Sequence, residues 1–204
     1  ETMTDNRDML RWNLAMGYNL SVDLYNGVSN PWADVAGVLQ REVLAGYADA
    51  PVTGFGQAAP EVTRTEFASK HAVTANWSPD EPYDMDASTT LAPGGFDVRS
   101  EDGNVRAGNY TRYDGFDLDP GEHILVEVRG GETIRVYQPY GADTTLQARK
   151  GDGWKHAVAA AYETDGTKIA DWPVTEIGDD VQFDYIALAG DRKVGYVELR
   201  ASEE

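Results

Sequence analysis

The sequence predicts a mainly β protein in which an antiparallel β-sandwich follows a helix–strand–helix segment. From Val62 onward, short runs of alternating polar and apolar residues are separated by turn residues, a pattern typical of antiparallel sandwiches. Before that point, apolar residues recur at helical spacing on either side of one alternating run. We therefore expect a helix–strand–helix segment over residues 1–50, a linker over 51–61 and the sandwich over 62–204.

The first segment reads as two helices around a strand. The first helix ends at Gly17, and the second begins at Pro31, where a missing N–H costs nothing, and closes at Gly46. Between them, Leu20–Leu24 alternates between apolar and polar residues and predicts a strand. This is the layout of the last repeat of a (β/α) barrel. The alternative is that both helices pack against the rest of this chain, with the strand joining its sheet as an edge.

The remainder reads as strands and turns. Gly, Pro and Ala dominate residues 51–61 and predict a linker. Strands are expected at Val62–Phe67, His71–Trp77, Thr89–Leu91, Phe96–Arg99, Val105–Tyr110, Ile124–Val128, Thr133–Gln138, Thr144–Arg149, Val181–Leu188 and Val194–Arg200. Gly130-Gly131 predicts a hairpin. Ala157–Tyr162 stays open between helix and strand, because its alanines favour a helix while its surroundings favour a sheet.

Composition excludes several classes of protein. The 204 residues include 35 Asp+Glu against 17 Lys+Arg, a formal net charge of -18, and no Cys. Without cysteine there is no disulfide scaffold, no cysteine-ligated metal and no cysteine nucleophile. The negative charge disfavours binding to nucleic acid or anionic lipid, because both would be repelled. No apolar run approaches the roughly 20 residues that a membrane-spanning helix needs. We interpret the acidity as a solvated surface; adaptation to salt is the alternative. The compartment, cytoplasmic or secreted, stays open.

Three short motifs and one helix carry a resemblance to a known group of enzymes. The run Met9–Ser21 resembles the end of the catalytic barrel in large bacterial glycoside hydrolases. Val73–Ser78, Thr90–Phe96 and Val105–Gly108 resemble, in the same order, elements of the β-sandwich that often follows that barrel. The resemblance extends to about Asp143-Thr144.

The resemblance implies a non-catalytic C-terminal portion of a glycoside hydrolase, which supports the catalytic barrel and contacts glycan. Its partners would be the missing N-terminal part of the same protein and a carbohydrate. The catalytic acids of such enzymes lie on earlier barrel strands, so no complete catalytic centre is expected here. Two alternatives remain: an independent carbohydrate-binding sandwich, and a structural or adhesion domain without a small ligand.

The barrel interpretation points to one set of glycan-binding residues. Active sites of (β/α) barrels lie at the C-terminal ends of the strands, where this chain has Asp23, Tyr25 and Asn26. Tyr25 would stack on a sugar ring, and the two polar residues would bond hydroxyls. The alternative is that these residues form only a tight turn, which Asn-Gly composition favours.

Two tryptophans and a run of carboxylates are the remaining candidates. Trp154 and Trp172 have polar or turn neighbours, which suggests exposed platforms for stacking against sugars. Alternating carboxylates near Gly turns are the ligands that Ca²⁺ takes, and they occur here at Asp114, Asp117, Asp119 and Glu122. A solvated turn is the favoured interpretation of this run, and no cofactor is expected.

Overall fold

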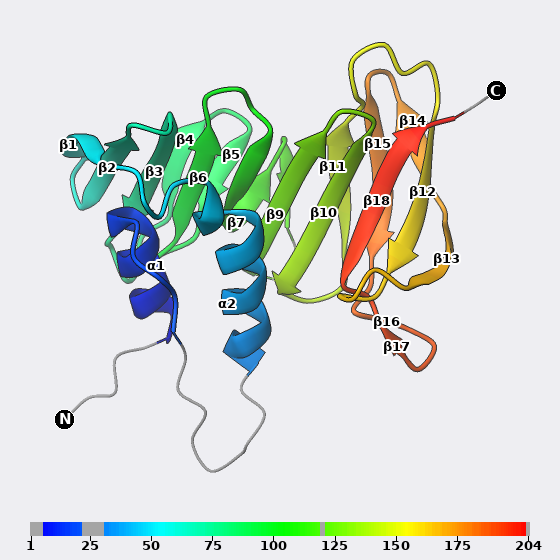
Figure 1. Ribbon diagram of the computed structural model, residues 1–204, viewed down its shortest axis with the longest axis horizontal. Coiled ribbons are helices and arrows are strands. Elements are labelled where there is room, and N and C mark those ends of the chain that lie inside the picture. Colours follow the sequence, from blue (N-terminus) through cyan, green and yellow to red (C-terminus); the bar gives the residue numbers. More distant parts are fainter. Residues whose placement is uncertain (1–5, 22–30, 119–120, 203–204) are drawn as a thin grey trace.

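The computed structural model describes residues 6–21, 31–118 and 121–202 (Figure 1). The protein is mainly β, with antiparallel sheets in a sandwich-like arrangement and two helices at the N-terminal end, so the predicted fold class is confirmed. The helices are α1 (Asn6–Met16), α2 (Pro31–Glu42) and the short 3-10 helix η2 (Leu44–Gly46). Neither of the two α-helices in the described residues is long and apolar enough to cross a bilayer.

Strands make up the rest of the described chain. They are β1 (Val52–Ala59), β2 (Val62–Phe67), β3 (His71–Asn76), β4 (Tyr83–Asp86), β5 (Thr89–Leu91), β6 (Phe96–Ser100), β7 (Val105–Tyr113), β8 (Phe116–Asp117), β9 (His123–Gly130), β10 (Thr133–Tyr140), β11 (Thr144–Arg149), β12 (Ala157–Tyr162), β13 (Lys168–Trp172), β14 (Thr175–Ile177), β15 (Asp180–Tyr185), β16 (Leu188–Ala189), β17 (Arg192–Lys193) and β18 (Tyr196–Ala201).

One long sheet of 13 strands extends through the whole molecule. Its main path is β1-β2-β3-β6-β7-β9-β10-β18-β12-β13, with β4, β5 and β8 attached beside it. A small sheet, β11-β15-β14, and the β16-β17 hairpin complete the fold. Figure 1 shows the long sheet running from β1 at one end to β13 at the other. Its strands pair in an antiparallel manner throughout.

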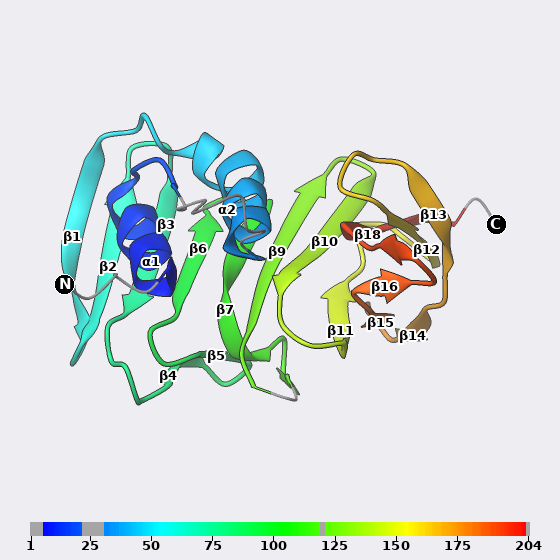
Figure 2. The same cartoon turned by 90° about the horizontal axis from the view of Figure 1, so that it is seen from below.

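Different elements pack on the two faces of the long sheet. Ile124 and Val126 of β9 belong to a core that includes α1 and α2, so we call this the helix face. Leu125, on the same strand, belongs to a second core shared with β11 and β15 of the small sheet. Successive side chains of a strand point to opposite faces, so the two cores lie on opposite sides. Figure 2 shows the helices and the small sheet over different halves of the sheet.

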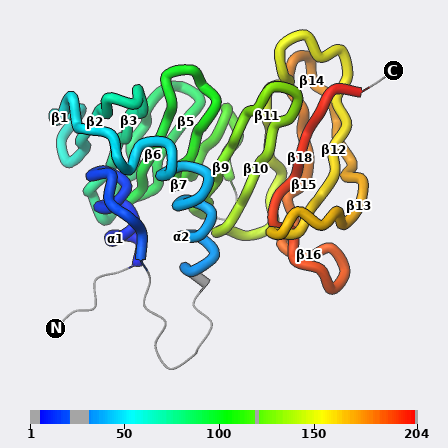
Figure 3. The backbone as a smooth tube through the Cα atoms, viewed as in Figure 1, coloured from blue at the N-terminus to red at the C-terminus, as the bar shows by residue number. Residues whose placement is uncertain are grey.

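Both helices pack on their own chain. Leu10 and Leu14 of α1 and Val35 and Leu39 of α2 are at most 1% exposed, buried against the helix face. The alternative to a barrel repeat, in which both helices pack against the rest of this chain, is therefore what the described residues show. Trp12, with 52% of its surface exposed, is the large hydrophobic residue of the two helices that stays open. The tube in Figure 3 shows the chain laying both helices across the sheet before it enters β1.

Two expected segments differ from the structure. The predicted linker contains β1, which pairs with β2 along its length. Its Gly54 and Gly56 suggested a flexible connection, yet glycine also occurs inside edge strands, where no side chain has to pack. The expected strand at Leu20–Leu24 is absent where the chain is described, up to Ser21, and its remainder lies outside the described residues.

The predicted sandwich strands are otherwise close to the observed ones. Ala157–Tyr162 is a strand, because Ala157, Ala159 and Ala161 alternate into the core between the two sheets. The Gly130-Gly131 hairpin is confirmed: Gly130 pairs with Thr133 across the turn. Sequence analysis missed β4, β13 and β14, which are short and mostly exposed and so lack an apolar alternation.

Candidate functional site

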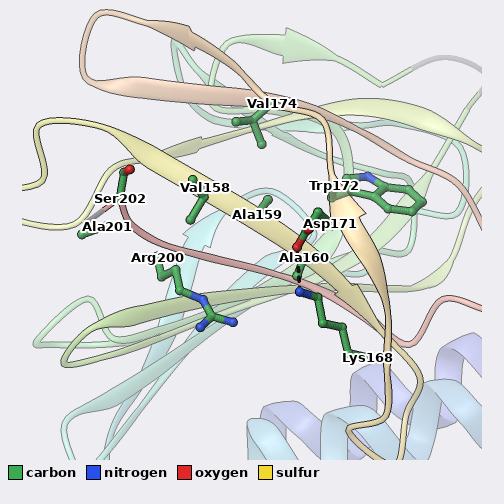
Figure 4. A pocket seen from close by; sticks show the side chains of 10 residues that line it. All are labelled: Val158, Ala159, Ala160, Lys168, Asp171, Trp172, Val174, Arg200, Ala201 and Ser202. Atoms are coloured by element: carbon green, nitrogen blue, oxygen red, sulfur yellow. Dashed lines mark hydrogen bonds and ion pairs between the residues drawn. The ribbon is translucent and has the colours of Figure 1, made fainter. Parts of the chain in front are cut away.

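A hollow of about 740 Å³ opens where β12, β13 and β18 meet at the end of the long sheet (Figure 4). Figure 1 shows β18, β12 and β13 continuing past α2 with no helix over them. The hollow is lined by Val158, Ala159, Ala160, Lys168, Asp171, Trp172, Val174, Arg200, Ala201 and Ser202. It contains Trp172, one of the residues expected to bind sugar.

Strand register determines which side chains meet on the helix face beside this hollow. Ala160 of β12 lies opposite Glu198 of β18 and Asp171 of β13. Two residues further along β12, a second row places Tyr162 opposite Tyr196 and Lys168. The alternate residues of β12 fill the core between the sheets. In the two rows Ala160, Glu198 and Tyr196 are buried, and Lys168 and Asp171 are open to solvent.

Charged side chains next to the hollow form a connected group. Glu198 Oε2 lies 2.9 Å from Arg135 Nε, and Glu198 Oε1 lies 3.4 Å from Arg200 Nη2. Arg200 also donates to the hydroxyl of Tyr162 at 2.8 Å, whose ring stacks on that of Tyr196 with centroids 5.0 Å apart. The hydrogen bond with Glu198 raises the pKa of Arg135. The group therefore presents fixed aromatic rings beside side chains rich in hydrogen-bond donors.

Across the hollow a second ion pair marks its rim. Lys168 Nζ donates to Asp171 Oδ1 at 2.6 Å, drawn as a dashed line in Figure 4. This hydrogen bond lowers the pKa of the Asp171 carboxyl. Both side chains are at least half exposed, so they can exchange this contact for one with a ligand at little cost.

Trp172 lines the hollow as part of its wall. The indole packs against the core between the sheets, and its Nε1 donates to the carbonyl of Asp184 at 2.7 Å. The side chain is therefore fixed in place, with only part of its surface open. This is a less exposed position than the sequence suggested.

Trp154 lies elsewhere. It is half-buried and lines a separate hollow of about 330 Å³ beside the β9–β10 hairpin, together with Arg129 and Asn104. A Cβ on Gly151 would come within 2.5 Å of the indole, so the ring lies flat against that glycine. The two hollows share no lining residue, so the structure does not bring Trp154 and Trp172 together.

The expected carboxylate run does not gather around a common point. Asp114 is paired with Arg106 at 2.5 Å, Asp117 with Arg112 at 3.6 Å, and Glu122 with Arg7 at 2.5 Å. In the described part of the chain, no group of three or more His, Asp or Glu side chains is arranged to hold a metal ion. Asp119 lies outside the described residues, as do Asp23, Tyr25 and Asn26.

Sequence analysis missed a buried polar network on the face opposite the helices. Tyr110 donates to Asp97 at 2.7 Å, and Tyr113 donates to Glu127 at 2.9 Å. The guanidinium carbon of Arg106 lies 4.2 Å from the centre of the Tyr113 ring. Burial raises the pKa of both tyrosines well above their ordinary value, so both phenols stay protonated and donate.

We assign this network a structural role. Asp97 and Glu127 are 2% and 6% exposed, and each carboxylate is also paired with an arginine, Arg99 or Arg129. Such saturated carboxylates have no capacity left for a substrate. Arg106 donates to Thr89 Oγ1 at 2.8 Å, which ties the attached strand β5 to β7.

The motifs behind the resemblance also have a structural purpose: they hold α1. Arg11 donates to the carbonyl of Asn76 at 3.1 Å and lies over the ring of Trp77 at 4.7 Å. Gly94 passes so close that an added Cβ would lie 2.8 Å from Arg11 Nη1. Residues from three separate stretches thus meet at one helix.

Comparison with known proteins adds no name: no family model, no curated protein and no solved structure matches this chain. The glycoside hydrolase resemblance therefore stays a prediction.

Proposed function

We propose that this chain is a non-catalytic carbohydrate-binding β-sandwich that binds a glycan in the hollow between β12, β13 and β18. One observation carries the proposal: the hollow of about 740 Å³ combines a fixed tryptophan wall with exposed charged side chains. A sugar has an apolar C–H face that suits an indole and hydroxyls that suit Lys, Asp and Arg. The volume is in the range of pockets that take small ligands.

The charged rim supports a polar ligand. Lys168, Asp171 and Arg200 come from two different strands and are all substantially exposed. A hydrogen bond with Tyr162 and an ion pair with Glu198 hold Arg200 in place before a ligand arrives. Such preorganisation reduces the entropy lost on binding.

A glycan array followed by isothermal titration calorimetry tests the proposal. We expect the wild-type protein to bind at least one glycan, and Arg200→Ala and the double variant Lys168→Ala with Asp171→Ala to weaken binding about tenfold or more, equivalent to ~1.4 kcal/mol. The matched control removes another exposed ion pair, Lys70 and Glu101, which lies away from the hollow. Its Nζ and Oε2 atoms are 2.6 Å apart, the same distance as in the pair of Lys168 and Asp171.

Two results contradict the proposal. The first is that no glycan binds to a protein that circular dichroism shows to be folded. The second is that the hollow variants bind as tightly as the Lys70 and Glu101 control. Trp172→Ala is a poor test, because it also removes the hydrogen bond to Asp184 and support for the core.

Support of a catalytic barrel is a second candidate. The observation that favours it is the pair of exposed aromatic residues at α1, Trp12 and Tyr18, with 52% and 61% of their surfaces open. Reading the gene upstream of the codon for Glu1 tests it. A frame that continues through alternating strands and helices would support this role, and a start codon directly upstream would end it.

A further inference from the structure

The edge strand β1 differs from the charged strands that end a sheet, and from the uncharged strand β16, which has two residues. β13 carries Lys168 and Asp171, β11 carries Arg149, and β14 carries Glu176. Charges on an edge discourage pairing with another chain. β1, at the opposite end of the long sheet, is longer, with 8 residues, and carries no charge.

The edge of β1 is also open and apolar. In the described part of the chain, β1 pairs with β2 alone. Phe55 at its centre is 63% exposed, and Val52 is 51% exposed. The flanking residues Pro51 and Pro60 are uncharged as well, in a chain whose formal net charge is -18. The acidity that keeps two copies apart elsewhere is absent along this strand.

We infer that β1 is a homodimer edge, where two copies of this chain pair β1 with β1 in an antiparallel manner around a two-fold axis at Phe55. Two-fold pairing is the commonest way in which identical chains associate, and an antiparallel edge is complementary to itself. It joins two long sheets into one. This inference does not depend on the glycan proposal, because the hollow lies at the far end of the sheet.

Charges on the neighbouring strand select this register. Gly54 lies opposite Glu66, and Gly56 lies opposite Arg64, so both charged side chains share one face with the two glycines. When Phe55 faces Phe55 of the second copy, Gly54 faces its Gly56. Glu66 of one copy then lies in the same row as Arg64 of the other.

The glycines leave room for this contact. In a single copy Arg64 Nε pairs with Glu66 Oε1 at 3.1 Å, and both side chains are about half exposed, so this contact can be exchanged for one with the second copy at little cost. Three strand spacings, about 14 Å between Cα atoms, separate the two rows, a gap that extended Glu66 and Arg64 side chains bridge. Nothing lies within 4 Å of the place where a Cβ would stand on Gly56. A register centred on Gly54 or Gly56 would instead place Glu66 in one row with Glu66, or Arg64 with Arg64, and would lose the pairing of opposite charges.

Sedimentation at rising protein concentration tests the inference. An interface of this kind is small, so we expect a weak dimer whose share rises with protein concentration. Phe55→Lys should abolish it, whereas Leu188→Lys, at a site 61% exposed on β16, should not. Arg64→Glu should break the dimer, and adding Glu66→Arg to it should restore it.

A cysteine scan gives an independent readout, because the chain has no Cys of its own. With oxidised glutathione, Phe55→Cys should give a disulfide-linked dimer, because residues on the two-fold axis face each other within the Cα distance that a disulfide spans. Thr53→Cys is the matched control on the same strand, and it should not form the disulfide crosslink, because the two copies of Thr53 lie apart in this register.

Three outcomes overturn the inference. A monomeric mass at every protein concentration would show that β1 does not pair with β1 of a second copy. A dimer that Phe55→Lys does not weaken would place the interface elsewhere. Equal crosslinking of Thr53→Cys and Phe55→Cys would contradict the register.

Discussion

The hydroxyl of Tyr110 shows how much a single buried atom contributes. It donates to Asp97 at 2.7 Å, and both side chains are buried. In Tyr110→Phe the carboxylate keeps Arg99 and loses the phenol. We expect the free energy of unfolding to fall by about 1–3 kcal/mol, the usual effect of leaving a buried polar group partly unsatisfied. Urea unfolding measures it, and Tyr18→Phe, at an exposed site, should change nothing.

His123 predicts a dependence on pH. Its side chain is 0% exposed, and burial lowers its pKa below the ordinary value despite a hydrogen bond with Gln138. Below about pH 6.5 the unfolded chain binds a proton at this histidine and the folded chain does not. The stabilisation is therefore complete above the ordinary pKa and is lost as the pH falls towards the folded pKa.

The measurement compares pH slopes. We expect the free energy of unfolding to decrease between pH 7 and pH 5, and His123→Gln to flatten that slope. The lowered carboxyl pKa of Asp171, which its hydrogen bond with Lys168 causes, acts at lower pH and is present in both proteins. An identical slope in the variant would rule out His123 as the source.

At the scale of single elements, α2 is the most informative test of how the helices belong to the fold. Leu39 is 0% exposed against the helix face, so Leu39→Ala should lower the free energy of unfolding by about 2–5 kcal/mol. Gly37, on the same helix, has nothing within 4 Å of an added Cβ. Gly37→Ala should therefore stabilise the protein by roughly 0.5–1 kcal/mol.

The shape of the transition carries the second part of this prediction. Because the helices and the long sheet share one core, tryptophan fluorescence and far-ultraviolet circular dichroism should report one transition that shifts as a whole in Leu39→Ala. A sheet that unfolds unchanged while the helix signal shifts would mean that residues 1–50 are dispensable.

Elements also show where sequence reasoning succeeds. The runs at Val62–Phe67, Thr89–Leu91 and Thr144–Arg149 match the observed strands, because alternation reflects burial on one face. Alternation did not predict β1 and β13 for the same reason, because an edge strand with little burial has no alternation of polar and apolar residues. For Ala157–Tyr162 the choice between helix and strand depends on its pairing with β18 and β13, which the local sequence does not contain.

At the scale of the whole molecule, one long sheet is covered on opposite faces at its two ends. The helices cover one face near β3 and β6, and the small sheet covers the other near β10 and β12. Each end therefore has a face without cover. The hollow lined by Trp172 lies at the β13 end of the sheet, and the uncharged edge of β1 lies at the other extreme.

The sequence by itself determined the class of the protein, most of its strands and the acidity of its surface, because these follow from local alternation and composition. It also singled out Trp172, though not Lys168 or Arg200 beside it. Only the tertiary structure decided that the helices pack on this sheet, that Asp97 and Glu127 are saturated, and that Trp154 and Trp172 lie apart. The physical reason is that contacts between residues far apart in the chain depend on strand order and register, and a local pattern contains neither.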